Sequence, residues 1–245
     1  VTFPSAVDEH ETMGVRFEYV ENGVYDRGGA RDNKIEAERV AELVFEHFLK
    51  RPNKTLGVVA FSQAQMTAID DAIERRLRQQ PFYDRFFRDD RLEGFFVKNL
   101  ENVQGDERDV LIFSVGYGKD AQGRMATNFG PLNKAGGERR LNVQITRARE
   151  TVIVVSSIRA DEIDLKSTNA TGALMLYHYL NYAEHGPEVL RREASASAGE
   201  PDSPFEADVA AAIREMGYEC IAQVGCSSYR IDIGVLDPAK PGRYI

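Results

Sequence analysis

The stretch that decides the fold is LGVVAFS, Leu56 to Ser62, a short continuous apolar run between two segments with helical periodicity. A run of this length without polar alternation is typical of a strand that is buried on both faces of a sheet. Residues 34–50 before it and 64–79 after it carry apolar side chains at the three- and four-residue spacing of an amphipathic helix. The sequence therefore predicts a helix, a buried strand and a second helix in succession.

Further strand and helix signals continue along the chain. The strand candidates are residues 15–20, 95–98, 110–115 and 151–156, and the helix candidates are residues 138–149, 160–166 and 171–184. Strands rich in β-branched residues that alternate with helices indicate an α/β fold, a doubly wound parallel sheet with helices on both faces. Because ligands of such sheets gather where strands lead into loops, we expect them at the carboxyl ends of the strands.

The composition is that of a globular protein with an acidic balance. Of the 245 residues, 42% are hydrophobic and 29% are charged, and the net charge is −8. This balance argues against a uniformly basic surface that coats duplex DNA, but it leaves room for a local basic groove. No apolar run reaches the roughly 18 residues of a membrane span. The cysteines, Cys220 and Cys226, form no CxxC pair, so we expect a reducing, cytoplasmic location.

Residues 194–204, ASASAGEPDSP, are small, polar and helix-breaking, which is a linker composition. They are expected to separate a larger domain, residues 1–193, from a smaller α/β segment, residues 205–245. The smaller segment is expected to contain a helix at 204–216 and strands at 218–224 and 229–236. The chain opens without an initiator Met and closes just after a strand candidate, so we expect a piece of a longer protein.

The most informative stretch for chemistry is Glu138–Arg149, ERRLNVQITRAR. On a helix, Arg140, Gln144 and Arg147 would form a stripe of donors beside an apolar stripe that packs on the sheet. A guanidinium group stays charged and offers a planar fork of donors, which suits phosphate. A solvated basic helix face is the alternative interpretation.

A second polar concentration, NLENVQGDERD at residues 99–109, leads directly into the strand VLIFSV. Gly105 allows the backbone to turn tightly or to approach a ligand closely. An ordinary connecting loop is the alternative. Residues 75–91 interleave arginines with aromatic side chains, as nucleic-acid surfaces do. Acidic neighbours dilute this charge, so we favour a partly buried, locally ion-paired insert there.

Taken in order, these segments resemble the second RecA-like motor domain of superfamily 1 helicases, in the branch of the nonsense-mediated-decay and flap-processing helicases. LGVVAFSQAQ (residues 56–65) resembles motif IV, NVQGDERDVLIFSV (102–115) motif V, and GGERRLNVQITRARE (136–150) motif VI. Asn33, Glu36 and Ala37 match the N-x-x-E-A segment that precedes motif IV in this branch.

The resemblance implies a role for each matching residue. Arg147 resembles the arginine finger that reaches the γ-phosphate of ATP bound against the other motor domain, and Arg140 and Gln144 are its companions. Gln104, Gly105 and Glu107 match positions near the nucleotide ribose and the metal–phosphate region. Single-strand backbone contacts are implied for Ser62, Gln65, Lys98 and Asn99. The implied cofactors are ATP and Mg²⁺, and the implied partners are single-stranded DNA or RNA and an N-terminal RecA-like domain, with no membrane.

The sequence departs from a whole helicase because it contains no G-x-x-x-x-G-K-[ST] phosphate loop. We therefore expect no ATP hydrolysis by this chain alone. One alternative is a nucleic-acid-binding or scaffold module that keeps the RecA-like shape without motor function. Another is a nuclease-led protein in which the motor remnant only positions the substrate.

The nuclease alternative rests on the C-terminal segment. A helix that carries Glu206, followed by strands with Asp232 in the second, resembles the start of a PD-(D/E)xK nuclease of the very-short-patch-repair type. That resemblance implies a Mg²⁺ site to which Glu206 and Asp232 contribute, and the site is incomplete because the chain stops at Ile245. A carboxylate that favours a helix N-terminus and a strand-end carboxylate are the plainer interpretations.

Overall fold

The computed structural model describes residues 14–88, 93–102, 106–125, 127–186, 189, 203–226, 229–239 and 244–245. The chain divides into two compact units, Val1–Glu184 and His185–Ile245. Of the expected linker at residues 194–204, only Ser203 and Pro204 lie in the described part. The larger unit holds a five-stranded sheet, and the smaller unit holds a helix and a two-stranded hairpin.

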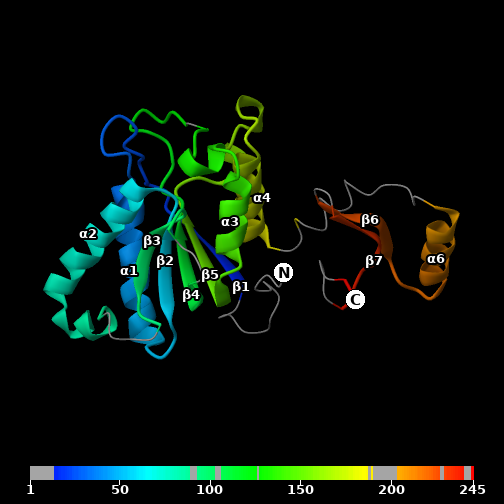
Figure 1. Ribbon diagram of the computed structural model, residues 1–245, viewed down its shortest axis with the longest axis horizontal. Coiled ribbons are helices and arrows are strands. Elements are labelled where there is room, and N and C mark those ends of the chain that lie inside the picture. Colours follow the sequence, from blue (N-terminus) through cyan, green and yellow to red (C-terminus); the bar gives the residue numbers. More distant parts are fainter. Residues whose placement is uncertain are drawn as a thin grey trace. The chain divides into compact units, whose positions relative to one another are not determined.

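The sheet of the larger unit has the strand order β1-β5-β4-β2-β3 (Figure 1). Its strands are β1 (Gly14–Tyr19), β2 (Leu56–Ala60), β3 (Phe96–Asn99), β4 (Arg108–Ser114) and β5 (Ala148–Ser156). Every neighbouring pair is parallel. This arrangement confirms the expected RecA-like α/β fold, and each of the expected strands in this unit is present.

Helices α1 (Lys34–Lys50) and α2 (Gln63–Gln79) cover one face of the sheet (Figure 1). Asn33 caps α1 by accepting a hydrogen bond from the backbone N–H of Glu36, and Ser62 caps α2 in the same way. Such caps satisfy backbone donors that a helix start leaves unpaired. Val40 of α1 and Ile69 of α2 pack in one buried cluster with the side chains of β2 that face these helices.

The opposite face of the sheet is covered by α3 (Gly137–Ile145) and α4 (Thr171–His185) (Figure 1). Phe113 of β4 packs there with Leu141 and Leu176 in a second buried cluster. Its neighbour Ile112 belongs to the first cluster. β4 is therefore buried on both faces, as expected of a parallel strand between two helical layers.

The helix that the sequence predicts for residues 138–149 is shorter in the structure. It ends at Ile145, and Ala148 already pairs with Arg108 of β4. The backbone N–H of Arg108 also donates to the carbonyl of Arg147, at 3.2 Å. Pairing with the sheet thus replaces the last helical turn that the periodicity predicted.

Residues 160–166, expected as a helix, form two short 3-10 turns instead, Ala160–Glu162 and Leu165–Ser167. The Asp164 side chain accepts a hydrogen bond from the backbone N–H of Lys166, at 3.0 Å, and so caps the second turn separately. A short polar side chain that captures a nearby backbone donor interrupts a helix in this way.

The arginine-rich segment at residues 75–91 is ion-paired and partly buried, which confirms the favoured interpretation. Arg76 binds Glu42 of α1 at 2.7 Å, and Arg75 binds the neighbouring Glu38. In the 3-10 helix Pro81–Phe86, the Phe86 ring is buried and stacks on Phe48 of α1 with centroids 4.6 Å apart. Residues 89–92 lie outside the described part.

The described part of the smaller unit includes α6 (Pro204–Glu215) and an antiparallel pair, β6 (Cys220–Cys226) and β7 (Tyr229–Val235). Ser203 caps α6 by accepting from the backbone N–H of Glu206, at 3.2 Å. The buried thiol of Cys220 donates to the carbonyl of Ala210, which ties the hairpin to the helix. Among the described residues, no helix is long and apolar enough to cross a bilayer.

A buried polar network joins the carboxyl ends of β4 and β5 to the start of α1. Glu36 has no exposed surface. Its carboxylate accepts hydrogen bonds from the Ser114 hydroxyl (2.8 Å) and from the backbone N–H groups of Gly116 (2.7 Å) and Ser157 (3.2 Å). Burial outweighs these hydrogen bonds and raises the pKa of Glu36 to about 7.

The raised pKa of Glu36 predicts how stability depends on pH. Between the unfolded value near 4.5 and the folded value of about 7, the folded state binds more protons than the unfolded state. The free energy of unfolding contributed by Glu36 is therefore full below pH 4.5 and falls as pH rises to about 7, by at most about 3 kcal/mol.

We expect Glu36→Gln to remove this loss, because its neutral amide does not titrate. Urea unfolding at about pH 5 and about pH 7.5 measures the difference between the variant and the native protein. Glu21→Gln, at an exposed position, is the matched control and should leave the pH dependence unchanged. Parallel pH profiles for the native protein and Glu36→Gln would contradict the prediction.

Candidate functional site

The residues that the sequence singled out in the larger unit divide between the two ends of the sheet. Glu107 and Arg147 precede β4 and β5, so they lie at the amino ends of these strands. Ser62 follows β2 and Asn99 ends β3, so they lie at the carboxyl ends. The expected gathering of ligand contacts at the carboxyl ends therefore does not hold for the whole set, and two places are involved.

At the amino ends, Arg147 and Glu107 form a loose ion pair. Nη1 of Arg147 lies 3.6 Å from Oε1 of Glu107, which is beyond hydrogen-bond distance. The Arg147 side chain is 29% exposed, and its Nε is buried without a hydrogen-bond partner among the described residues. Buried N–H groups are normally satisfied, so Arg147 is not saturated by its described partners, and its Nη1 is held only by the long contact to Glu107.

Arg149, two residues further on, is held much more firmly. It donates two hydrogen bonds to the Glu93 carboxylate, at 3.0 and 2.6 Å. Its guanidinium also lies 3.8 Å from Oε2 of Glu107 and 3.7 Å from Oδ1 of Asp109. Of these two arginines, Arg147 is therefore the one that can change partners at low cost.

Arg140 lies near the start of α3, whereas Arg147 lies beyond its end. Nη1 of Arg140 is 3.4 Å from the carbonyl oxygen of Pro131 and 3.3 Å from that of Ala135, so it holds the turn before the helix. The continuous stripe that the sequence predicts is broken, because α3 ends at Ile145. The remaining predicted nucleotide-handling groups lie outside the described part: Gln104, Gly105 and the side chain of Gln144.

At the carboxyl ends, Gln65 has a structural position. Its side chain is fully buried. It accepts a hydrogen bond from the backbone N–H of Asn33 (2.7 Å) and donates to the Asn33 carbonyl (3.2 Å) and to the Ser114 hydroxyl (3.0 Å). Gln65 therefore holds the loop before α1 against β4 and leaves no group exposed to contact a strand, unlike the role implied by the resemblance.

Lys98 and Asn99 lie together at the end of β3 but differ in exposure. The Lys98 ammonium pairs with Asp106 at 2.5 Å, and 34% of its side chain is exposed. Asn99 is buried, donates to Oε1 of Gln63 (2.7 Å), and accepts from the backbone N–H groups two and three residues later (3.0 Å each). Asn99 thus shapes the turn after β3, and Lys98 is the more accessible of the two.

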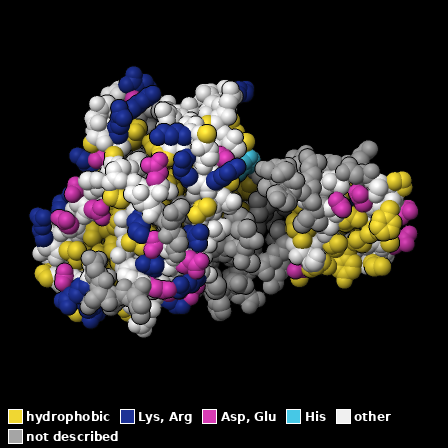
Figure 2. Space-filling model, viewed as in Figure 1, with side chains coloured by type: hydrophobic (Ala, Val, Ile, Leu, Met, Phe, Trp, Pro, Cys, Tyr) yellow, Lys and Arg dark blue, Asp and Glu magenta, His cyan; other side chains and the backbone are white. Residues whose placement is uncertain are grey.

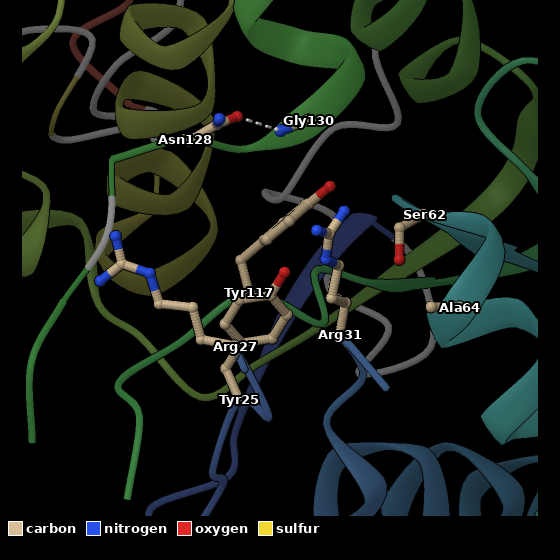
Figure 3. Close-up of a pocket in the computed structure, with 8 residues that line it drawn as sticks. All are labelled: Tyr25, Arg27, Arg31, Ser62, Ala64, Tyr117, Asn128 and Gly130. Atoms are coloured by element: carbon tan, nitrogen blue, oxygen red, sulfur yellow. Dashed lines mark hydrogen bonds between the residues drawn. The ribbon is translucent and has the colours of Figure 1, made fainter. Parts of the chain in front are cut away.

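The carboxyl ends of β1, β2 and β4 also lead into the loops around a cavity of about 450 Å³ (Figure 3). The cavity is lined by Tyr25, Arg27, Arg31, Ser62, Ala64, Tyr117, Asn128 and Gly130. None of these lining residues is acidic. Ser62 is thus the predicted nucleic-acid contact that lies on this cavity.

A second cavity, of about 620 Å³, shares Tyr25 and Arg27 with the first. Its far side includes Asp120 and Arg124. The Asp120 carboxylate accepts from the backbone N–H and from Nε of Arg124, at 2.9 and 3.0 Å, so its charge is locally matched. Figure 2 shows Lys and Arg side chains, in dark blue, gathered over the loops at this end of the larger unit.

Sequence reasoning missed the lining residues from the loops after β1 and β4. Tyr25, Arg27 and Arg31 lie in YDRGGAR, where two arginines flank a pair of glycines in the loop after β1. That pattern is a usable signal, because glycines in a loop allow close approach of a ligand. Tyr117 and Asn128 carried no signal, since their part in the cavity depends on tertiary packing.

In the smaller unit, the two residues of the nuclease resemblance have different surroundings. The Glu206 carboxylate accepts from the Ser203 hydroxyl (2.9 Å) and from Nε2 of Gln223 (3.2 Å). Asp232 lies on β7 and is exposed. Among the residues that the structure describes, no group of three or more His, Cys, Asp or Glu side chains could hold a metal ion. The nuclease-like site stays a prediction.

A parallel sheet between two helical layers, with a loosely paired arginine at one end and a cationic cavity at the other, defines the larger unit as a RecA-like α/β domain. A family model described as an AAA domain matches residues 9–159. This match spans more than half of the chain, and the chain belongs to that family.

Two relatives from mycoplasmas share this region. The chain is 41% identical over 133 residues to an uncharacterized ATP-dependent helicase of Mycoplasma pneumoniae, the MG140 homolog, and 40% identical over 133 residues to MG140 of Mycoplasma genitalium. Each alignment covers 54% of this chain but only 12% of the relative. The chain thus spans about an eighth of the length of these relatives.

A solved structure, the C-terminal domain of a possible DNA helicase from Lactobacillus plantarum WCFS1, is 18% identical. The alignment covers 50% of this chain and 67% of that one, with a TM-score of 0.32. At that score the likeness supports no inference about fold or function.

The position of Gln65 predicts a loss of stability on substitution. Gln65→Leu keeps the side-chain volume but removes the partners of the buried Asn33 and Ser114 groups. We expect the free energy of unfolding to fall by about 1–3 kcal/mol, measured by urea unfolding. Gln79→Leu, at an exposed position in the last turn of α2, is the control and should change it little. Equal stabilities of the two variants would contradict the structural role of Gln65.

Proposed function

We infer that this chain is the second motor domain of an ATP-dependent nucleic-acid helicase. In this proposal, Arg147 acts on the nucleotide from the amino ends of the strands, and the carboxyl ends hold a single strand. Membership of the AAA domain family supports the motor assignment. The two mycoplasma relatives, named as ATP-dependent helicases, support it further.

The observation that carries the nucleotide assignment is the state of Arg147. Its pair with Glu107 is long, at 3.6 Å, and its Nε is buried without a described partner. A phosphate oxygen could therefore replace Glu107 without breaking a strong hydrogen bond. An arginine that reaches the γ-phosphate stabilises the charge that builds up during phosphoryl transfer, worth about 10³–10⁵ in rate.

Glu107 lies beside Arg147 with half of its side chain exposed. It fits the proposed place near the ribose and the metal–phosphate region, because a carboxylate can accept from a hydroxyl or from metal-bound water. ATP and Mg²⁺ would be held mainly by the P-loop domain, for which this sequence has no motif. Arg147 would then complete the site from across the cleft when the two domains close.

The smaller unit adds a proposed nuclease-like segment to this motor domain. Its support is limited to the helix–hairpin order and to the carboxylates of Glu206 and Asp232. A cytoplasmic location follows from the same proposal, since a nucleic-acid motor works where its substrate and ATP are present.

The proposal predicts the effect of removing the Arg147 guanidinium. In a protein where a P-loop domain precedes this chain, we expect Arg147→Ala to lower nucleic-acid-stimulated ATP turnover by about 10³. Arg147→Lys should restore little, because an ammonium lacks the planar fork of donors. Steady-state phosphate release measures both, and oligonucleotide binding should stay unchanged.

Arg139→Ala is the matched control, because it removes an equal charge from α3 at a side chain that is 88% exposed. It should leave ATP turnover unchanged. If Arg147→Ala hydrolyses ATP at the native rate, the arginine-finger role is wrong. If the native protein itself shows no nucleic-acid-stimulated ATP turnover, the result favours the alternative of a scaffold module without motor function.

A further inference from the structure

We propose that the two adjoining cavities at the carboxyl end of the sheet bind consecutive nucleotides of a single strand, with Arg27 and Arg31 on its phosphates and Tyr25 against a base. This inference rests on the proposed function, since it names the residues that would hold the strand. These residues lie in the loop after β1, outside the segments that resemble helicase motifs.

The charges available to a phosphate come from two arginines of one loop. Arg27 and Arg31 both line the first cavity, and both are exposed. Neither side chain forms a hydrogen bond or an ion pair with a described residue, in contrast to the arginines of α2. Phosphate can therefore bind them without first displacing an acidic partner.

The loop that carries these arginines is held in shape by its own acid. The Asp26 carboxylate accepts from the backbone N–H groups of Gly29 (3.0 Å) and Ala30 (2.9 Å). A Cβ at Gly29 would lie 2.3 Å from that carboxylate, so a side chain there would force the Asp26 carboxylate to shift. The Asp26 carboxylate is thus hydrogen-bonded to the backbone of its own loop. These hydrogen bonds hold the backbone that carries the two arginines in one conformation.

An aromatic surface lies between the two charges. The rings of Tyr25 and Tyr117 have centroids 5.5 Å apart and are tilted by 56°. Tyr117 is buried, whereas Tyr25 is partly exposed and borders both cavities. In Figure 3, Arg27 and Arg31 extend to opposite sides of Tyr25. An exposed aromatic face beside cationic groups is the arrangement on which single-stranded bases stack.

The position of Tyr117 depends on an adjacent glycine. Gly130 has a φ of +55°, and a Cβ there would lie 2.2 Å from the Tyr117 hydroxyl. Burial raises the pKa of Tyr117, so its hydroxyl stays protonated at neutral pH. Tyr117 therefore packs against the Tyr25 ring as a neutral residue and adds no charge that would repel a phosphate.

The shape of the site favours a strand over a free nucleotide. The cavities measure about 450 and 620 Å³ and share Tyr25 and Arg27 as their common wall. Two hollows on either side of one aromatic side chain suit two linked nucleotides. The start of α2, with Ser62 and Ala64 in the first cavity, adds the favourable potential of a helix N-terminus for an anion.

The test is binding of fluorescently labelled oligo(dT) and oligo(U), each about ten nucleotides long, measured by anisotropy over a range of salt concentrations. We expect the double variant Arg27→Ala/Arg31→Ala to raise the dissociation constant by about tenfold. It should also lower the slope of log K against log salt by about 1.4, which corresponds to two phosphates of a single strand. Tyr25→Ala should weaken binding by about tenfold with an unchanged slope, and Tyr25→Phe should restore it.

The matched control is Arg78→Ala/Arg88→Ala, which removes two positive charges at side chains that are 78% and 64% exposed. It should leave both the affinity and the salt slope close to native. Thermal unfolding of each variant checks that the fold is retained. A double variant at Arg27 and Arg31 that binds like this control, or a native chain that binds neither oligonucleotide, would overturn the inference. The ratio of the two native dissociation constants identifies DNA or RNA as the preferred strand.

The outcome is separable from that of the proposed function. Oligonucleotide binding by this chain needs no ATP, whereas the Arg147 experiment measures turnover. Loss of turnover in Arg147→Ala together with native binding in the Arg27 and Arg31 variant would defeat only the proposal that the two cavities bind a single strand. Native turnover in Arg147→Ala together with weakened binding in the Arg27 and Arg31 variant would defeat the arginine-finger assignment alone.

Discussion

The carboxyl end of the sheet depends on one buried carboxylate. Glu36 accepts hydrogen bonds from residues at the ends of two neighbouring strands, β4 and β5, and no described cation forms an ion pair with it. Asn33 and Gln65 extend this network to the loop after β1 and to α2. Polar contacts therefore help to hold the loop after β1, the start of α2 and the loop after β4, which all line the first cavity. This geometry is gained at the cost of desolvating a carboxylate.

Most of the fold of the larger unit could be predicted from hydrophobic periodicity. The run at Leu56–Ala60 and the helices on either side appear almost to the residue, because buried parallel strands and amphipathic helices differ clearly in period. Predictions failed where another interaction outweighs periodicity. At Ala148 pairing with β4 replaces the last helical turn, and this long-range contact gives no signal in local spacing. At Asp164 the competing interaction is local, because the side chain caps a separate turn.

The candidate sites were predictable in part, for a related reason. The resemblance to helicase motifs brought Glu107 and Arg147 into one hypothesis, and Arg147 Nη1 lies 3.6 Å from Glu107 Oε1 in the structure. The same resemblance did not indicate that Gln65 hydrogen-bonds Asn33, because this contact joins residues 32 positions apart. The cavity residues were missed since they come from loops that meet only after the sheet has formed. Residue type indicates chemistry, but long-range packing decides which groups remain accessible.

One strand links the two places where chemistry is expected. β4 begins directly after Glu107 and ends three residues before Tyr117, so its seven residues span roughly 20 Å between them. It is clamped by a parallel neighbour along each edge and by side chains on both faces. A strand held in this way is rigid along its length. A displacement at its first residue would therefore move the sheet as a rigid body and would not deform the strand locally.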